Sequence, residues 1–556
     1  MLKARDFIVI AILNIILFVF FLFFTPTMYS SDYRVDSEKV ILRANFPDRV
    51  SESESVTMIA KGMENEIAVL GFRDQEATKT VTDTLMYMQI GFTVYDSIAD
   101  VRQEKTAIVT TSDISDSDVL MLKEWLKNDK GVIFTVMPKD LSEVICDFLG
   151  IENHTPTYEA AGFTFYEGIF LGGLVHNGIY PLICRGIELD FRCRVFASGY
   201  GMELKEEIEE EPIHAEYPDK TPMIWRLVHE GGEVYVVNAP FMEDSKGSGV
   251  LAGILSLHLK DLIYPVVGTK TVALFNFPYL MGDILVDSRS SYLYTRDLIW
   301  PSLVSVAKNL NIAYTCYPSG DFYGGEDAFN NLEFMYDELY RLNFSELGCA
   351  PANQAMLDRN ANFLQEVFGD IEFHSLLNAS FEPSGHITAV SNSDGFDGFS
   401  WITNSAVNLP VTGSGVDLEE GSFAYESYVT AFGYGMHVVD MEPVYLNVAT
   451  ANEYMRDAGI KLFDYFSNRN YLAPHSAKDA AEQVKNYLNV NMAASYRPNG
   501  VSVALAGNDM PAKFILRTTK KIDEDGLDGC EIKEIYENVY LITAADDFAI
   551  RFLAED

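Results

Sequence analysis

The stretch Thr271-Val272-Ala273-Leu274-Phe275-Asn276-Phe277 decides the fold predicted for the central part of this 556-residue chain. It is a short apolar run with β-branched and aromatic residues, which is typical of a buried strand. Strand and helix patterns alternate after it. Further strands are predicted at 312–317, 344–347, 373–377, 407–411 and 437–439, and helices at 300–310, 329–342, 360–368 and 452–468. Repeated units of this kind predict an α/β barrel of parallel strands, complete or distorted, over residues 266–478.

Residues 66–265 show the same alternation before the barrel. The run Ile67-Ala68-Val69-Leu70-Gly71 predicts a strand, and Ser115 or Asp116 is suited to cap a helix that runs to Lys127. The other strands are predicted at 93–95, 106–110, 132–136 and 234–238, and the other helices at 78–88 and 247–262. This order predicts a parallel, doubly wound sheet. Residues 150–233 are predicted as an insertion that includes an acidic, solvated loop at 206–211.

The last part of the chain, residues 479–556, shows a different pattern of secondary structure. After a linking helix, strands without helical periodicity are predicted at 501–505, 512–516, 530–536 and 539–543. Short strands separated by turns predict a small antiparallel β-sandwich. A module of this kind either binds carbohydrate or has a structural role, and the sequence leaves both alternatives open.

The N-terminus carries an apolar run at 7–24 that only Asn14 interrupts. A helix of ~18 residues at ~1.5 Å per residue just spans the hydrocarbon core of a membrane. Because Lys3 and Arg5 precede the run, the positive-inside rule predicts a signal-anchor at 1–25, a stalk at 26–65 and an extracytoplasmic location for the rest. A cleaved signal peptide is the alternative, but Thr25-Pro26-Thr27-Met28 offers no small-x-small cleavage site.

The charge balance is strongly acidic. Lys and Arg number 41 against 81 Asp and Glu, which gives a net charge of −40. A surface of this charge repels nucleic acid and argues against a DNA- or RNA-binding role. It attracts a cationic partner, such as an amino-sugar polymer with free amines. The alternative is that the charge only keeps the protein soluble.

Six cysteines are present, and none belongs to a CxxC pair. Cys184 and Cys193 flank residues 185–192, which are compatible with a hairpin. A cross-strand disulfide between them stays open, because hairpin geometry is not visible in a sequence.

Residues 66–265 resemble the class I glutamine-amidotransferase-like fold in their pattern of strands and helices. True amidotransferases carry a nucleophilic cysteine in the turn after a central strand. Here the turn after residues 132–136 reads Met137-Pro138-Lys139. Because the nucleophilic cysteine of that family is absent from this turn, the resemblance implies a non-catalytic domain.

Residues 266–478 resemble the polysaccharide deacetylases of the NodB-homology type, which fold as (β/α)₇ barrels with the catalytic site at the C-terminal strand ends. The whole layout is similar to a group of anchored bacterial proteins associated with Pel-type exopolysaccharide systems. The family's Asp-Asp pair corresponds to Asn276 and Phe277 here. Its two metal-binding histidines have no counterpart in Gly348-Cys349-Ala350-Pro351-Ala352-Asn353, and no two of the nine histidines lie three to five residues apart. We therefore expect no metal and no cofactor.

Other polar residues are candidates for chemistry. His437 matches the position at which the family places a general acid, and Asp394 and Asp397 flank Gly395. These aspartates, like Asp283 and Asp287, are alternatively turn formers or helix caps. The candidate catalytic residues are Asp283, Asp287, His437 and Asp440. Rings stack on sugars and amides bond hydroxyls, which makes Asn276, Tyr317, Trp401, Asn404 and Tyr434 the candidate substrate-binding residues, with Tyr323 and Tyr425 in similar segments.

The sequence thus predicts a membrane-anchored, extracytoplasmic protein that binds or guides an exopolysaccharide through a deacetylase-like barrel without its metal site. One alternative is an active enzyme, either a divergent deacetylase or a glycoside hydrolase that uses Asp283, Asp287, His437 and Asp440. Another is a structural partner that assembles with polysaccharide synthase subunits through the amidotransferase-like domain.

Overall fold

The computed structural model describes most of the chain from residue 67 to residue 553. The gaps are at 72–74, 102–103, 128–129, 167, 174–175, 179–180, 202–219, 230, 281–284, 287–288, 319, 324, 343–344, 370–371, 384–385, 393–397, 417–421 and 468. The predicted fold class included a membrane-spanning helix, and this is corrected: no helix in the described part is both long and apolar enough to cross a bilayer. The run at 7–24, the stalk and the acidic run at 206–211 lie outside the described residues.

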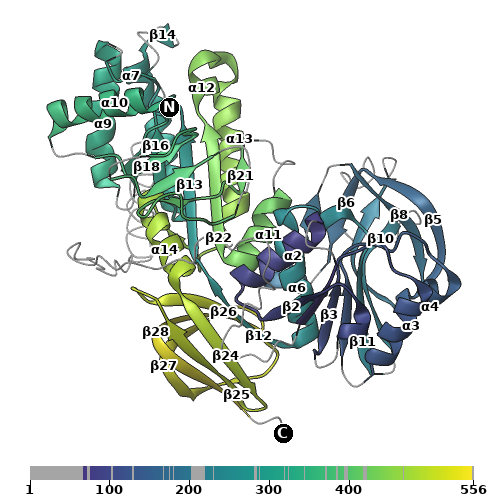
Figure 1. The fold of residues 1–556 in the computed structure, drawn as a ribbon. Coiled ribbons are helices and arrows are strands. Elements are labelled where there is room, and N and C mark those ends of the chain that lie inside the picture. Colours follow the sequence, from purple (N-terminus) through teal and green to yellow (C-terminus); the bar gives the residue numbers. More distant parts are fainter. Residues whose placement is uncertain are drawn as a thin grey trace, which may run out of the picture. The chain divides into compact units, whose positions relative to one another are not determined.

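The N-terminal region is built on a nine-stranded sheet (Figure 1). Its parallel half is, in spatial order, β2 (Phe92–Tyr95), β1 (Ile67–Leu70), β3 (Thr106–Val109), β4 (Gly131–Phe134) and β11 (Gly232–Val237). The antiparallel half continues with β10 (Lys220–His229), β9 (Arg194–Tyr200), β6 (Gly162–Phe165) and β7 (His176–Gly178). Strand β11 pairs directly with β4, so residues 150–233 lie between two neighbouring parallel strands, and most of their strands extend the same sheet.

A two-stranded ribbon of β5 (Ile151–Ala160) and β8 (Leu182–Leu189) stands beside this sheet. Cys184 lies on β8, whereas Cys193 immediately precedes β9, which pairs with β10 and β6 and not with β8. Both cysteines are free. The disulfide left open by the sequence is not formed, because the strands that would hold it are not neighbours.

Helices surround the parallel half of the sheet. They are α2 (Glu76–Tyr87), α3 (Asp116–Trp125), α4 (Glu143–Leu149) and α6 (Ser248–Leu259), with single turns η1 (Ile98–Asp100), η2 (Leu171–Gly173), η3 (Pro240–Met242) and η4 (Ser245–Gly247). Ser115 caps α3 as the sequence predicts, in a reciprocal capping box with Asp118.

The central region is a closed barrel of parallel strands. β13 (Thr269–Phe275) pairs with β16 (Tyr314–Tyr317) on one side and β22 (Tyr434–Asp440) on the other. From β16 the ring continues through β17 (Glu346–Leu347), β18 (Ser375–Leu377), β19 (Ala389–Ser391) and β20 (Val407–Asn408), and β21 (Gly413–Ser414) pairs with β22. A parallel bridge between Cys349 and Leu376 joins β17 to β18. The segment 407–414 supplies both β20 and β21, so it joins the two sheets on the other side, and the ring is made of eight described strands.

Alternation along β13 shows which side chains face the inside of the barrel. Lys270 donates to the carbonyl of Leu310, at the end of an outer helix, with an Nζ–O distance of 3.1 Å. Lys270 and its alternate neighbours therefore face outward, and Phe275 faces inward. Asp440 is the register partner of Phe275 on β22, so its side chain faces the same way.

The outer helices are α7 (Ser291–Tyr294), α8 (Trp300–Leu310), α9 (Glu326–Arg341), α10 (Gln354–Phe368), α11 (Ser422–Phe432), α12 (Glu442–Leu446) and α13 (Val448–Phe466), with a π-helical turn η5 (Thr295–Ile299) and short strands β14 (Leu285–Val286), β15 (Arg289–Ser290) and β23 (Ala473–Pro474). The start of α14 (Ala477–Asn489) closes the N-terminal end of the barrel. The amide of Ala477 donates to Thr315 Oγ1 at 2.8 Å, and that of Lys478 donates to Glu346 Oε2 at 2.8 Å. The first-turn amides of α14 are thus satisfied by barrel side chains.

The C-terminal region is a six-stranded antiparallel sheet around its own apolar core. Its strands are β12 (Asp261–Val266), β26 (Ala512–Thr518), β28 (Val539–Phe552), β25 (Gly500–Ala506) and β24 (Asn491–Arg497), with β27 (Ile522–Tyr536) paired to β28. β12 comes from the middle of the chain. The predicted helix at 247–262 ends earlier, at Leu259, because Lys260 adopts a left-handed φ of 61°.

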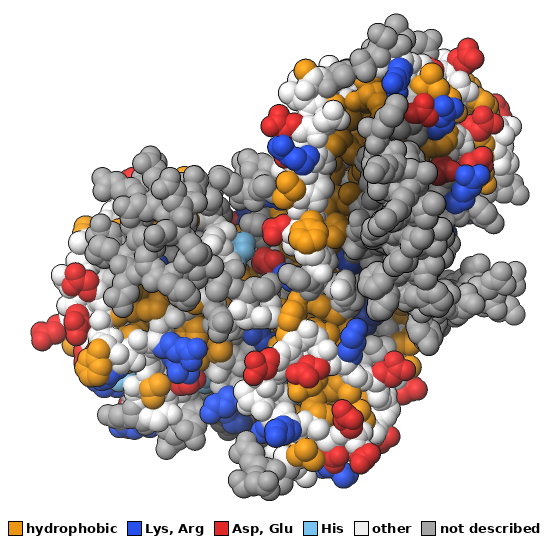
Figure 2. Space-filling view, turned by 180° about the vertical axis from the view of Figure 1, so that it is seen from behind, with side chains coloured by type: hydrophobic (Ala, Val, Ile, Leu, Met, Phe, Trp, Pro, Cys, Tyr) orange, Lys and Arg blue, Asp and Glu red, His pale blue; other side chains and the backbone are white. Residues whose placement is uncertain are grey.

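Strand β27 forms an edge of this sheet: within the described chain it pairs with β28 alone. It carries six carboxylates and one lysine, the carboxylates being Asp523, Glu524, Asp525, Asp528, Glu531 and Glu534. Figure 2 shows carboxylate side chains over this part of the surface, at the bottom of that view. We call these six residues the acidic edge.

Two contacts tie the three regions together. Helix α6 packs closely on α11, where the amide of Gly249 donates to Ser427 Oγ at 2.7 Å. Arg469, which is 2% exposed, contacts both carboxylate oxygens of Glu426 on α11 at 2.6 and 2.5 Å. The same guanidinium donates to the hydroxyl of Tyr536 on β27 at 3.1 Å. The ring of Tyr536 also packs closely against Gly172, because a Cβ added to that glycine would lie 2.8 Å from the ring.

Candidate site at the mouth of the barrel

The C-terminal ends of β13 and β22 bring Asn276 and Asp440 together. Asn276 follows β13 with a left-handed φ of 54°, a conformation that asparagine adopts more readily than most residues. Its Nδ2 donates to Asp440 Oδ1 at 2.7 Å, and the amide of Glu442 donates to the same oxygen at 3.0 Å. Two donors, one just after β13 and one at the start of α12 (Glu442–Leu446), therefore hold one oxygen of the carboxylate in place.

The backbone of Asp440 is fixed as well. Its carbonyl accepts a hydrogen bond from the hydroxyl of Tyr454 on α13, and the next amide, that of Met441, donates to the carbonyl of Phe275 at 2.9 Å. Burial, and then the nearby charge of Asp440, raises the pKa of Tyr454 to about 12. Tyr454 therefore remains a hydrogen-bond donor at neutral pH.

Among the described residues, no hydrogen bond reaches Oδ2, the second carboxylate oxygen of Asp440. Within the same part of the chain, no lysine or arginine forms an ion pair with this carboxylate. The side chain is partly exposed, as is the inward-facing ring of Phe275 at the same level of the neighbouring strand. A fixed carboxylate next to a partly exposed aromatic residue is an arrangement that can bind a polar ligand with an apolar face.

His437 does not join this site. It lies three residues before Asp440 on the same strand, so its ring faces the outer helices. The imidazole is fully buried, its Nε2 lies 2.8 Å from the carbonyl of Gly415, and its ring centroid lies 5.0 Å from that of Tyr465. Burial, assisted by the charge of Lys461, lowers the pKa of His437 to about 4. The imidazole is neutral at physiological pH and does not face Asp440.

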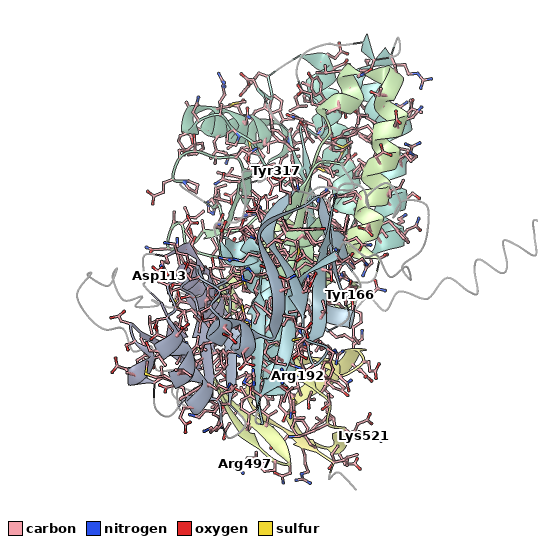
Figure 3. All side chains as sticks on the ribbon, turned by 90° about the vertical axis from the view of Figure 1, so that its right-hand side faces the viewer. Asp113, Tyr166, Arg192, Tyr317, Arg497 and Lys521 are labelled. Atoms are coloured by element: carbon pink, nitrogen blue, oxygen red, sulfur yellow. The ribbon has the colours of Figure 1, made fainter. Side chains whose placement is uncertain are left out.

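The structure separates the other predicted residues. Asp283, Asp287, Asp394 and Asp397 lie outside the described residues. Tyr317 and Tyr434 are fully buried, and Figure 3 shows Tyr317 among the barrel strands. Trp401 and Asn404 lie on the hairpin that leads into β20, at the N-terminal end of that strand, whereas Asp440 lies at a C-terminal end. Of the predicted set, Asn276 and Asp440 are hydrogen-bonded to each other at the barrel mouth, whereas Tyr317 and Tyr434 interact only as buried residues.

Sequence reasoning missed Phe275 and Tyr454. The period-two pattern of residues 271–277 was sufficient to place Phe275 on the inward face with Thr271 and Ala273. No signal in the sequence points to Tyr454, because its partner is a backbone carbonyl on another element.

The described residues do not fit the metal centre that a NodB-type deacetylase carries. The predicted correspondence places Asn276 and Phe277 at that family's two carboxylates, and His437 faces away from the mouth. Within the described ranges, no three histidine, cysteine or carboxylate side chains are placed to hold a metal ion.

Comparison with known proteins shows that this chain shares its fold with a solved structure. The carbohydrate deacetylase Agd3 superposes with a TM-score of 0.55 at 9% identity, covering 88% of this chain and 99% of that chain. At this identity the likeness shows a shared fold and nothing finer. A β-galactosidase from Bacillus circulans sp. alkalophilus aligns over 36% of this chain and 33% of its own, at 13% identity and a TM-score of 0.25. An α-L-fucosidase isoenzyme 2 from Paenibacillus thiaminolyticus aligns over 37% of this chain and 36% of its own, at 12% identity and a TM-score of 0.26.

The two glycosidase scores are too low to carry an argument. No family model matches the chain, and no curated protein matches it. The resemblance to NodB-type deacetylases and to the Pel-associated group stays a prediction.

Proposed function

We propose that this protein binds a carbohydrate polymer at the C-terminal mouth of its barrel, with Asp440 as the anchoring group. The observation that carries the proposal is the state of this carboxylate: Oδ1 accepts two hydrogen bonds from the protein, and Oδ2 accepts none from the described residues. A carboxylate held in this way is pre-organised to accept hydrogen bonds from a ligand. The shared fold with a carbohydrate deacetylase supports carbohydrate as the ligand class.

The charge of the chain favours a cationic polymer. A net charge of −40 raises the local concentration of cations near the protein, and Asp440 lacks a basic partner among the described side chains. An amino-sugar unit with a free ammonium would pair with Oδ2 and place its apolar face on Phe275. The sequence supports binding without metal-assisted hydrolysis, because Asn276 and Phe277 lie where the resemblance to NodB-type deacetylases would place two carboxylates.

The test is calorimetric titration of the chain with partially deacetylated and fully acetylated amino-sugar oligomers. We expect the deacetylated oligomers to bind more tightly, and the difference to shrink with added salt. Asp440→Asn keeps the acceptor oxygen and removes the charge, so it should weaken binding of the deacetylated oligomers about tenfold, which is about 1.4 kcal/mol. Asp546→Asn is the matched control, because that aspartate is exposed on another region.

The variant Trp401→Ala tests which end of the barrel binds the polymer. If the polymer binds at the mouth, this change at the opposite strand end should leave the affinity unaltered. Equal affinity of the wild type for both oligomer types at low salt would remove the charge argument. No binding to either would favour the alternative of an assembly partner of synthase subunits.

Hydrolysis is the second candidate, because a carboxylate fixed by two donors with one oxygen free is also how a general base is held. Release of acetate or of new reducing ends during the same titrations would establish it. Loss of that release in Asp440→Asn would assign the base.

A further inference from the structure

An exposed aromatic ring stands on the loop that follows β16. Tyr323 is 52% exposed, whereas Tyr317 and Tyr434 are fully buried. Because the loop follows the C-terminal end of a barrel strand, it lies on the same side of the barrel as Asp440. Tyr323 is therefore a large exposed ring on the face that carries the proposed site.

Residues 320–323, which present this ring, are anchored on α10. Phe322 is fully buried, and its amide donates to Asn360 Oδ1 on α10 at 3.2 Å. Asn360 Nδ2 donates back to the carbonyl of Gly320 at 3.1 Å. Asn360 is itself fully buried, so one side chain clamps the loop at two points.

The ring has support of its own. Its centroid lies 4.7 Å from that of Phe363 at an interplanar angle of 74°. The amide of Tyr323 donates to Asp321 Oδ1 at 3.2 Å, and Asp321 forms an ion pair with Arg359 on α10 at 3.1 Å. A ring held by these contacts loses little conformational freedom when a ligand covers it.

The order of the strands separates Tyr323 from Asp440. β13 lies between β22, which ends at Asp440, and β16, which leads to the loop of Tyr323. Two strand spacings amount to about 10 Å. This is the separation of the strand ends, and Tyr323 lies six residues beyond the end of β16, against Phe363 of α10. A sugar unit on Asp440 and a ring on Tyr323 would therefore be different units of one chain.

We propose that Tyr323 is a second subsite, on which one unit of an extended carbohydrate stacks while another unit binds Asp440. This inference rests on the proposed function and deepens it, because it makes the ligand an oligomer of several units rather than a single sugar. Sugars present an apolar face of C–H groups, and a rigid tyrosine offers a matching flat surface.

The experiment is a length series of amino-sugar oligomers titrated against the wild type and three variants. Tyr323→Ala should weaken the long oligomers about tenfold and leave the shortest one that binds unchanged. Tyr323→Phe should retain most of the affinity, because stacking needs the ring and not the hydroxyl. Tyr336→Ala is the matched control. Tyr336 lies on α9, is 37% exposed and packs on Phe368 at the end of α10, away from the loop of Tyr323.

The outcomes separate the two proposals. If Tyr323→Ala binds every length like the wild type while Asp440→Asn weakens all lengths, the second subsite is refuted and the mouth site stands. An equal loss for every length in Tyr323→Ala also refutes it, because a second subsite cannot act on a ligand too short to reach it. Absence of binding by the wild type overturns both.

Discussion

Arg469→Met should destabilise the fold by breaking a buried ion pair. Arg469 is 2% exposed and holds Glu426, whose side chain is 14% exposed, through two contacts of 2.6 and 2.5 Å. Methionine fills a similar volume but leaves the Glu426 carboxylate buried without a counter-charge, and it removes the hydrogen bond to Tyr536. Breaking a buried ion pair in this way costs about 3–5 kcal/mol. Because Glu426 keeps some access to water, we expect a loss near the lower end, about 3 kcal/mol in the free energy of unfolding.

Equilibrium urea denaturation followed by circular dichroism measures this loss at the first transition. The double variant Arg469→Met with Glu426→Leu removes both charges, so it should recover most of the stability. Arg456→Met is the control, because its ion pairs on α13 are exposed, and it should change the free energy by less than about 0.5 kcal/mol. A change below about 1 kcal/mol for Arg469→Met, or a double variant as unstable as the single one, would refute the role given to the buried charge.

Two further predictions concern stability. Burial lowers the pKa of both His437 and His176 from 6.5 to about 4, so the folded state favours the neutral form, and the stability that each contributes is complete above pH 6.5 and is lost as the pH falls toward 4. Over this pH window the contribution of each histidine to the free energy of unfolding should fall by about 3 kcal/mol. In His437→Gln the urea midpoint should therefore fall less steeply with falling pH than in the wild type. An equally steep fall in the variant would contradict the assignment. Gly249→Ala should destabilise by about 1–3 kcal/mol, because the new Cβ would lie 2.4 Å from the Cα of Ser427. Gly459→Ala in α13 is its control, since the Cβ there meets no atom within 4 Å, and a loss as large in this variant would show that the α6–α11 contact is not the cause.

Local patterns predicted the elements that are apolar and regular. Residues 271–275 of the run at 271–277 lie in strand β13, which begins two residues earlier and ends before Asn276, and the helix predicted at 300–310 is α8 with those bounds. Where the pattern was weak, prediction failed. Residues 522–529 are acidic and contain two glycines, so they carry no strand signal, yet β27 begins at Ile522 because β28 is there to pair with it. β12 was missed for the same reason, since its partner β26 lies some 250 residues further along the chain.

The site shows the same limit. The sequence named Asn276 and Asp440 separately, but their contact joins residues 164 positions apart and depends on the closure of the barrel. The prediction that His437 and Asp440 act together neglected the period of a strand, in which residues three apart point to opposite faces. The buried positions of Tyr317 and Tyr434 were also not readable, because an aromatic residue near a strand end looks the same whether it fills the barrel or lines its mouth.

The acidic edge of β27 has a consequence for how copies of this protein meet. Within the described chain this strand of 15 residues pairs on one side only, so its other side could accept a second β27, and such edges promote aggregation. Two copies that approach in this way bring six carboxylates against six others, and the repulsion opposes the pairing. Salt screens this repulsion. High ionic strength should therefore favour self-association of this protein, and exchanging these acids for amides should do so even at low salt.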